Sequence, residues 1–110
     1  MDDLPPAGKD LARNRYFAHI RAHKQWKQGI QGYLASIYFA DAMLGRVLDA
    51  LEKGPHADNT IVALWSDHGW HLGEKEHWQK FTAWRACSRV PFILRVPKGA
   101  PGLPAGTLPG

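Results

Sequence analysis

The longest regular pattern in the chain is helical. Apolar side chains recur every three or four positions between residues 30 and 53, at Ile30, Tyr33, Leu34, Ile37, Leu44, Val47, Leu48 and Leu51. This period places them along one face of an α-helix, so the sequence predicts a single helix over residues 30–53 with a buried apolar face. Gly54 and Pro55 follow directly and supply a natural stop.

Two later apolar runs predict strands. Residues 60–65 are continuously β-branched or apolar, and residues 90–96 form a second run with Pro91 near its start, where a missing N–H is tolerated. Continuous runs of this kind are typical of strands buried on both faces of a parallel sheet. We therefore expect an α/β fold in which the two runs are neighbouring strands of a mostly parallel sheet. The helix of residues 30–53 should pack on one face of that sheet.

The remaining segments carry weaker patterns. Residues 1–28 mix prolines, glycine and charges, and we expect them to be irregular apart from one short helix that starts near Tyr16. Residues 69–89 are rich in His, Glu, Lys and Trp and predict a loop with a helical turn at residues 82–87. Residues 97–110 hold four prolines and four glycines, which predict a loop or linker.

Composition narrows the choice of protein class. A length of 110 residues bounds the chain to one domain, and 45% hydrophobic with 22% charged residues argues against disorder. The net charge of +4 favours anionic partners, but the basic residues do not alternate with aromatics as a nucleic-acid platform requires, so no nucleic acid is expected. No apolar run is long enough to span a membrane, and no signal peptide is present in this chain.

Candidate chemistry begins where the first predicted strand ends. The carboxyl ends of strands in open α/β sheets are where ligands gather, and Asp67 and His68 offer an oxygen and a nitrogen to one divalent ion if the chain bends at Gly69. A plain strand-ending turn, with Gly69 at positive φ, explains the same residues. A zinc site at His68 and His71 is disfavoured because no further ligand pair stands at zinc-finger spacing.

Several motifs in one order resemble the sulfatases of the alkaline phosphatase superfamily, most of all the iduronate-2-sulfatase group. The resemblance covers about residues 30–97, and its most specific parts are TIVALWSDHGWHLGE at residues 60–74 and HWQK at residues 77–80. It implies that residues 1–110 are a partial sulfatase catalytic domain. The implied fold is a fragment of an α/β, alkaline-phosphatase-like sandwich whose mostly parallel sheet is flanked by helices.

The resemblance also implies roles for individual residues. Asp67 and His68 match the family's Asp-His pair, which binds calcium or a similar divalent metal together with two acidic residues from an earlier strand. Lys80 matches a lysine that contacts the sulfate on the leaving-group side, where a cation offsets the charge that builds up. These roles require the Lys80 nitrogen to lie within roughly 10 Å of the Asp67 carboxylate. His71 and His77 either contact the substrate or pack the loop that carries Lys80.

One family motif is missing from the chain. Sulfatases use a formylglycine made from a Cys/Ser-x-Pro-x-Arg motif, and no such motif occurs here. The only cysteine, Cys87, begins a stretch in which proline and arginine stand in the wrong order, so we expect Cys87 to be a structural thiol. We therefore expect the isolated chain to be inactive without the missing N-terminal part of the domain.

The resemblance leaves three functions open. The favoured one is a sulfuric ester hydrolase that acts on a sulfated sugar in the full-length enzyme. A phosphonate or phosphate ester hydrolase of the same superfamily uses a similar site, and a non-catalytic remnant that binds a sulfated ligand is also consistent with the missing nucleophile. The family implies a periplasmic, secreted or lysosomal location.

Overall fold

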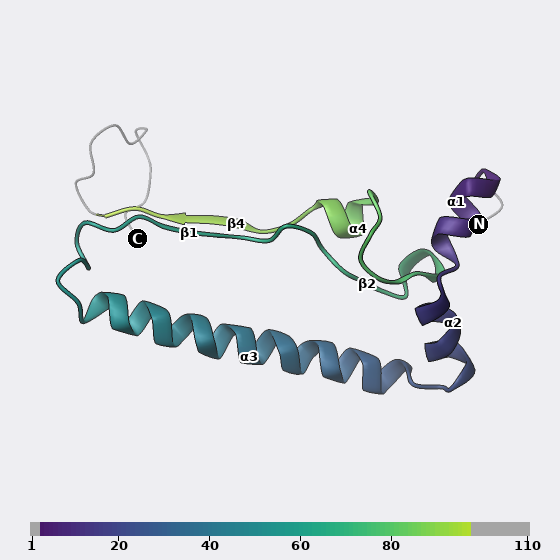
Figure 1. The fold of residues 1–110 in the computed structure, drawn as a ribbon, viewed down its shortest axis with the longest axis horizontal. Coiled ribbons are helices and arrows are strands. Elements are labelled where there is room, and N and C mark those ends of the chain that lie inside the picture. Colours follow the sequence, from purple (N-terminus) through teal and green to yellow (C-terminus); the bar gives the residue numbers. More distant parts are fainter. Residues whose placement is uncertain (1–2, 98–110) are drawn as a thin grey trace. The chain divides into compact units, whose positions relative to one another are not determined.

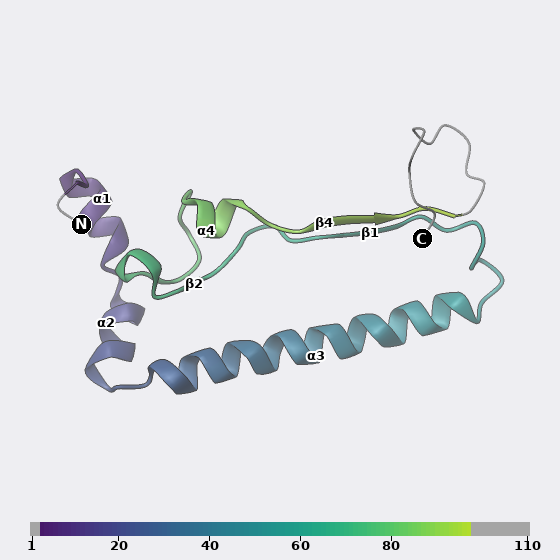
Figure 2. The same cartoon turned by 180° about the vertical axis from the view of Figure 1, so that it is seen from behind.

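The computed structural model describes residues 3–97, with helices in the first half and short strands in the second (Figures 1 and 2). In chain order the elements are α1 (Pro6–Ala12), α2 (Arg15–Ala22), α3 (Trp26–Glu52), β1 (Val62–Trp65), β2 (His71–Leu72), the 3-10 helix η1 (Glu74–Glu76), β3 (Trp78–Gln79), α4 (Arg85–Ser88) and β4 (Phe92–Arg95). They form two compact units. Within the described residues, the first unit joins residues 3–36 with Ser66–Val90, and the second joins Ile37–Trp65 with residues 91–97.

The helices largely follow the sequence pattern. The single long helix is confirmed as α3, which begins four residues earlier than predicted. The short helix predicted near Tyr16 is α2, which is capped by the Asn14 side chain and ends before Lys24, whose φ of 54° interrupts the helix. Helix α1 was not predicted. Its two prolines stand at the N-cap and the first helical position, where a proline loses no intrahelical hydrogen bond.

The two predicted strands are neighbours, as expected, but they run antiparallel and not parallel. β1 pairs with β4 in the register Val62↔Arg95 to Trp65↔Phe92, and this pair is antiparallel. A parallel connection needs a crossover that carries the chain back along the sheet, usually a long helix. The segment between β1 and β4 contains only short elements, so the chain returns in the opposite direction. The described strands therefore do not form a mostly parallel sheet.

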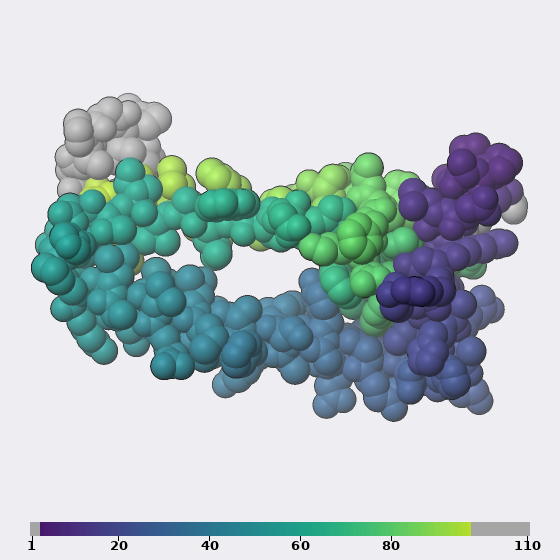
Figure 3. Space-filling view, in the orientation of Figure 1, coloured from purple at the N-terminus to yellow at the C-terminus, as the bar shows by residue number. Residues whose placement is uncertain are grey.

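The predicted burial of these elements is also wrong. No residue of α3 is buried, and the apolar side chains of Leu34, Ile37 and Val47 are 57%, 50% and 65% exposed. In the space-filling view the side chains of α3, coloured blue to teal, stay visible along the helix (Figure 3). β1 and β4 are mostly exposed as well. A sheet of two four-residue strands has too little surface to bury the apolar face of a long helix, and the helix cannot bury both faces of the sheet.

Within residues 3–97, most of the buried side chains lie in the first unit, around the loop of residues 66–90. They include His71, His77, Trp78, Thr82 and Cys87. Aromatic rings hold this loop to the helices, with Trp26 edge-on to Trp78 and Tyr33 stacked on Trp70 at ring-centroid distances of 5.8 and 5.9 Å. Gly73 has a φ of 118°, and a Cβ on Gly73 would overlap the Trp26 ring, so only glycine fits there.

Two other expectations concern the ends and the surroundings of the chain. The linker predicted for residues 97–110 falls almost wholly outside the described residues, which end at residue 97. None of the helices within residues 3–97 combines the length and apolar character needed to cross a membrane.

Candidate active site

Asp67 and Lys80 are brought together by a loop that folds back on itself. Asp67 follows β1 by two residues, and Lys80 directly follows β3, which pairs antiparallel with β2. The Lys80 Nζ donates to the Asp67 Oδ2 at 3.1 Å. The predicted proximity of these two groups, within roughly 10 Å, is thereby confirmed. Connectivity alone does not enforce it, because an extended chain of thirteen residues reaches about 40 Å.

The contact changes the acidity of the carboxyl group. The hydrogen bond from Lys80, followed by the ammonium charge of the same residue, lowers the pKa of Asp67 below its ordinary value. The Asp67 side chain is 79% exposed and that of Lys80 is 35% exposed. Because the pair is open to water, salt screens it, and a more strongly charged ligand can compete for either partner.

Lys80 lies in a strained piece of backbone. The residues on either side of it, Gln79 and Phe81, have φ values of 91° and 75°. Positive φ is rare for residues other than glycine and is costly for a bulky one such as phenylalanine. Such strain persists only where neighbouring contacts hold it, and it is concentrated at functional sites in proteins. The side chain of Phe81 is 75% exposed, so burial of its ring does not explain the conformation.

His68 lies beside this pair with both ring nitrogens close to backbone carbonyls. Its Nδ1 is 2.8 Å from the Gly69 oxygen and its Nε2 is 2.9 Å from the Thr82 oxygen. A neutral imidazole carries one N–H, so it can donate to only one of these oxygens. To bind a metal, His68 must turn one nitrogen away from its carbonyl.

The residues present fit part of a metal site by their chemistry. Asp67 supplies an exposed carboxylate and His68 an imidazole, and both are common ligands of divalent ions. Among residues 3–97, however, no three or more His, Cys, Asp or Glu side chains cluster closely enough to hold a metal. Asp67 and His68 can therefore provide two ligands, and the remaining ones must come from elsewhere.

Gly69 has a different role from the one expected of a turn. Among the described glycines only Gly73 has a positive φ, so the predicted positive φ at Gly69 is wrong. The Gly69 N–H donates to the Cys87 oxygen at 2.7 Å, and a Cβ at Gly69 would lie 2.5 Å from the Ala86 oxygen. The absence of a side chain thus lets the residues after Asp67 pack directly against α4. Cys87 is a buried free thiol, as predicted.

His71 and His77 are brought together, but inside the unit. Their side chains are 0% and 3% exposed, and their rings are edge-on with centroids 5.0 Å apart. His71 Nε2 is 2.7 Å from the Thr82 hydroxyl oxygen, whereas His71 Nδ1 is buried without a hydrogen-bond partner. Burial, and secondarily the charge of His77, lowers the pKa of His71. His71 is therefore favoured in its neutral form.

His77 ties the N-terminal segment to the loop that carries Lys80. Its Nδ1 is 2.8 Å from the Leu11 oxygen, and its Nε2 is 3.1 Å from the Asn14 Nδ2 and 3.0 Å from the Lys80 oxygen. A neutral ring protonated at Nδ1 donates to Leu11 and accepts from Asn14, which satisfies both nitrogens. Of the two roles left open by the sequence, this geometry favours loop packing. Substrate contact by His71 and His77 stays a prediction.

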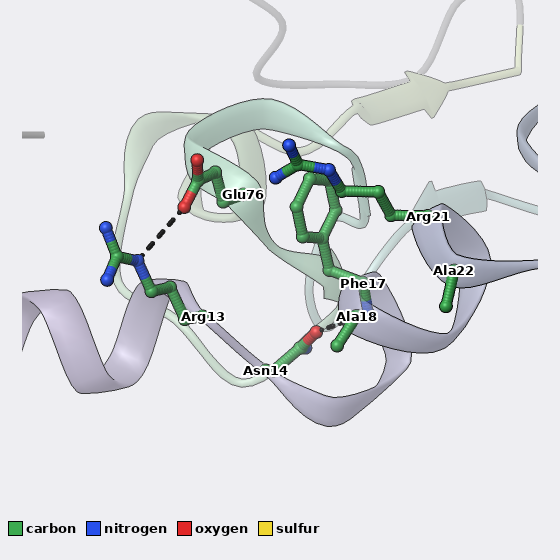
Figure 4. A pocket seen from close by; sticks show the side chains of 7 residues that line it. All are labelled: Arg13, Asn14, Phe17, Ala18, Arg21, Ala22 and Glu76. Atoms are coloured by element: carbon green, nitrogen blue, oxygen red, sulfur yellow. Dashed lines mark hydrogen bonds and ion pairs between the residues drawn. The ribbon is translucent and has the colours of Figure 1, made fainter.

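Two of the cavities that the described residues form lie in the first unit. One of about 420 Å³ is lined by Lys80 together with residues that sequence reasoning missed, among them Asp10, Arg15, Tyr16, Gln79 and Phe81. The other, of about 590 Å³, is shown in Figure 4, where Arg13 and Glu76 point toward one another and form an ion pair of 3.1 Å. None of the predicted site residues lines the second cavity.

The sequence of the chain is similar to that of known sulfatases. A protein-family model described as Sulfatase matches residues 5–105. A sulfatase of Formosa agariphila is 41% identical over 109 residues, covering 96% of this chain and 21% of that protein. Iduronate 2-sulfatase of Mus musculus is 45% identical over 75 residues, covering 68% of this chain and 14% of that protein. An N-acetylglucosamine-6-O-sulfatase of Bacteroides thetaiotaomicron is 39% identical over 74 residues, covering 67% and 13%.

The chain belongs to the sulfatase family. It spans about a fifth of the length of the Formosa relative and less of the other two. No solved structure matches the chain. The resemblance inferred from the motifs around Asp67 and Lys80 is confirmed.

Proposed function

We propose that this chain supplies Asp67, His68 and Lys80 to the active site of a sulfatase that hydrolyses a sulfate ester. The observation that carries the proposal is the 3.1 Å contact between the Lys80 ammonium and the Asp67 carboxylate. In it, a cation able to bind an anionic group lies beside a carboxylate able to bind a metal. The strained backbone on both sides of Lys80 supports a functional role for its position.

Lys80 acts on the sulfate group in this proposal. Its ammonium binds a sulfate oxygen on the leaving-group side and offsets the negative charge that grows on the departing oxygen. In the free chain Asp67 takes the place of that anion as the partner of Lys80. Sulfate binding therefore replaces one ionic partner of Lys80 with another.

Asp67 and His68 would hold a divalent ion, calcium by the family resemblance, together with ligands from outside residues 3–97. When bound, the ion supplies positive charge that neutralises sulfate oxygens. By the same resemblance, a formylglycine from outside the matched region would supply the nucleophile. The relatives named iduronate 2-sulfatase and N-acetylglucosamine-6-O-sulfatase support a sulfated sugar as the substrate.

Turnover of p-nitrophenyl sulfate tests the proposal. The isolated chain should show none, with or without calcium, because it has no Cys/Ser-x-Pro-x-Arg motif. If the reading frame continues upstream through such a motif, the longer protein should hydrolyse the ester. In that protein Lys80→Ala should lower kcat/KM about 100- to 1,000-fold, a loss typical of a group that stabilises developing charge. Lys75→Ala, which removes an exposed lysine from the same loop, is the matched control.

Three results would contradict the proposal in different ways. Turnover by the isolated chain that disappears in Lys80→Ala would mean that the chain carries a complete site. Full activity of Lys80→Ala in the longer protein would remove the sulfate-binding role. A preference of the longer protein for a phosphate or phosphonate ester would favour the alternative hydrolase class.

A further inference from the structure

The cavity beside Lys80 has the composition of a ring-binding site. It is built from two stretches far apart in the sequence, residues 10–16 and residues 77–81, and its volume of about 420 Å³ falls in the range of small-molecule pockets. Lys80 lines one part of it, and Arg15 and Tyr16 of α2 line another. A ligand whose sulfate is held by Lys80 thus has its remaining atoms within reach of α2.

Arg15 and Tyr16 are arranged for binding before any ligand arrives. The Arg15 guanidinium lies 4.8 Å from the centre of the Tyr16 ring and donates to the Tyr16 hydroxyl at 2.8 Å. Arg15 has no ion pair with a carboxylate among the described residues, so most of its N–H groups stay available. A guanidinium that is already held in place loses less freedom when a ligand binds.

The other lining residues suit a hydroxylated ring. Tyr16 and Phe81 present aromatic surface, and they are 41% and 75% exposed. The apolar face of a sugar ring packs on such surface, while ring hydroxyls bond to groups such as the Gln79 amide, the Asp10 carboxylate and the Arg15 guanidinium. Phe81 is left exposed by a backbone held at positive φ, an arrangement that packing within the chain does not require.

The two sides of the cavity are fixed to each other. The Asn14 side chain, which caps α2 directly before Arg15, also donates to the Trp78 oxygen and to the ring of His77. His77 in turn contacts the Leu11 oxygen. The position of Arg15 and Tyr16 relative to Lys80 is therefore set by partly buried hydrogen bonds and not by the exposed side chains themselves.

From this arrangement we infer that the cavity binds the ring of the sulfate ester, with Arg15 and Tyr16 as specificity-determining residues. The inference rests on the proposed function, because it takes Lys80 as the sulfate-binding group. The ligand class is a ring-bearing sulfate ester with free hydroxyls on the ring, that is, a sulfated monosaccharide unit.

Amide-detected NMR titration of the full 110-residue chain tests sulfate binding by Lys80 separately from ring binding by Arg15 and Tyr16. The probes are inorganic sulfate and N-acetylglucosamine 6-sulfate. The chain should bind the sugar sulfate at least about threefold more tightly than inorganic sulfate, the gain expected from one or two additional hydrogen bonds. Arg15→Ala and Tyr16→Ala should each weaken sugar sulfate binding about threefold to tenfold and leave the affinity for inorganic sulfate unchanged.

Two further variants complete the design. Arg21→Ala removes the same charge from the same helix, but Arg21 lines the other cavity, so both affinities should stay as in the unmodified chain. Lys80→Ala should weaken the binding of both ligands. Tyr16→Phe keeps the ring and should retain more of the preference than Tyr16→Ala. Unchanged amide signals outside residues 10–16 and 77–81 verify that each variant is folded.

The outcomes are distinguishable. Equal affinity for the two probes, or a preference that survives both Arg15→Ala and Tyr16→Ala, overturns the inference about the ring while leaving Lys80 as the sulfate-binding group. Sulfate binding that is absent, or indifferent to Lys80→Ala, overturns the proposed function and the ring site with it.

Discussion

His77→Ala should destabilise the first unit far more than an ordinary histidine substitution. The substitution removes the partly buried hydrogen bond to the Leu11 oxygen, at a cost of about 0.5–1.5 kcal/mol. It also removes the ring contacts with His71 and Trp84, whose centroids lie 5.0 and 6.1 Å away, each contributing about 0.5–1.5 kcal/mol. We expect the free energy of unfolding to fall by about 1.5–4.5 kcal/mol.

Urea denaturation followed by tryptophan fluorescence measures this loss, since four of the five tryptophans lie in the first unit. The matched control is His19→Ala on α2. His19 is exposed, so its substitution should change stability by no more than about 0.5 kcal/mol. As a second readout, the Asp67 pKa should rise in His77→Ala, because the loop that presents Lys80 loses the hydrogen bond that His77 makes to the Leu11 oxygen. A stability within about 0.5 kcal/mol of the unmodified chain, with an unchanged Asp67 pKa, would refute the structural role of His77.

Three further predictions follow from the same contacts. Lys80→Ala should raise the pKa of Asp67 toward its ordinary value, as measured by NMR titration of the carboxyl carbon; an unchanged pKa would rule out the ion pair in solution. Because the pKa of His71 is lowered on folding, the unfolded chain binds more protons, so stability should be full above pH about 6.5 and fall as the pH drops toward the folded-state pKa. Urea midpoints between pH 8 and pH 5 test this, and His71→Gln should flatten the profile. Gly73→Ala should cost about 2 kcal/mol or more through positive φ and overlap, whereas Gly45→Ala, in open space on α3, should stabilise by about 0.5–1 kcal/mol.

Local patterns in the sequence predicted where the helices and strands lie better than they predicted what packs against them. The period of Ile30 to Leu51 is a property of neighbouring residues, and α3 follows it. The composition of residues 60–65 and 90–96 likewise identified two adjacent strands. Burial and strand direction depend on what lies against an element, and an apolar stripe does not contain that information. For this reason Leu34 and Val47, which the pattern predicted to be buried, are exposed.

The candidate site was predictable where a motif fixed it and not where distant segments meet. The motif around Asp67 and Lys80 was sufficient to predict their proximity. The contacts of His77 with Leu11 and Asn14 join positions more than 60 residues apart, and nothing in a local pattern signals them. The one available hint was Asn14, a preferred N-cap residue placed directly before Arg15 and Tyr16, which marks the start of α2.

We propose that Asp67, His68 and Lys80 belong to one site for a metal and a sulfate group. If they do, calcium at Asp67 and His68 and inorganic sulfate at Lys80 must bind with positive coupling. Calcium offsets the negative charge of Asp67, which repels sulfate, and sulfate offsets the positive charge of Lys80, which repels calcium. The decisive measurement is the Kd for inorganic sulfate with and without calcium, for the unmodified sequence and for Asp67→Asn. It is made in the longer protein, which supplies the metal ligands that residues 3–97 do not group around Asp67 and His68. We predict that calcium tightens sulfate binding about fivefold or more and that Asp67→Asn abolishes this effect. A sulfate Kd that is the same with and without saturating calcium would contradict the claim.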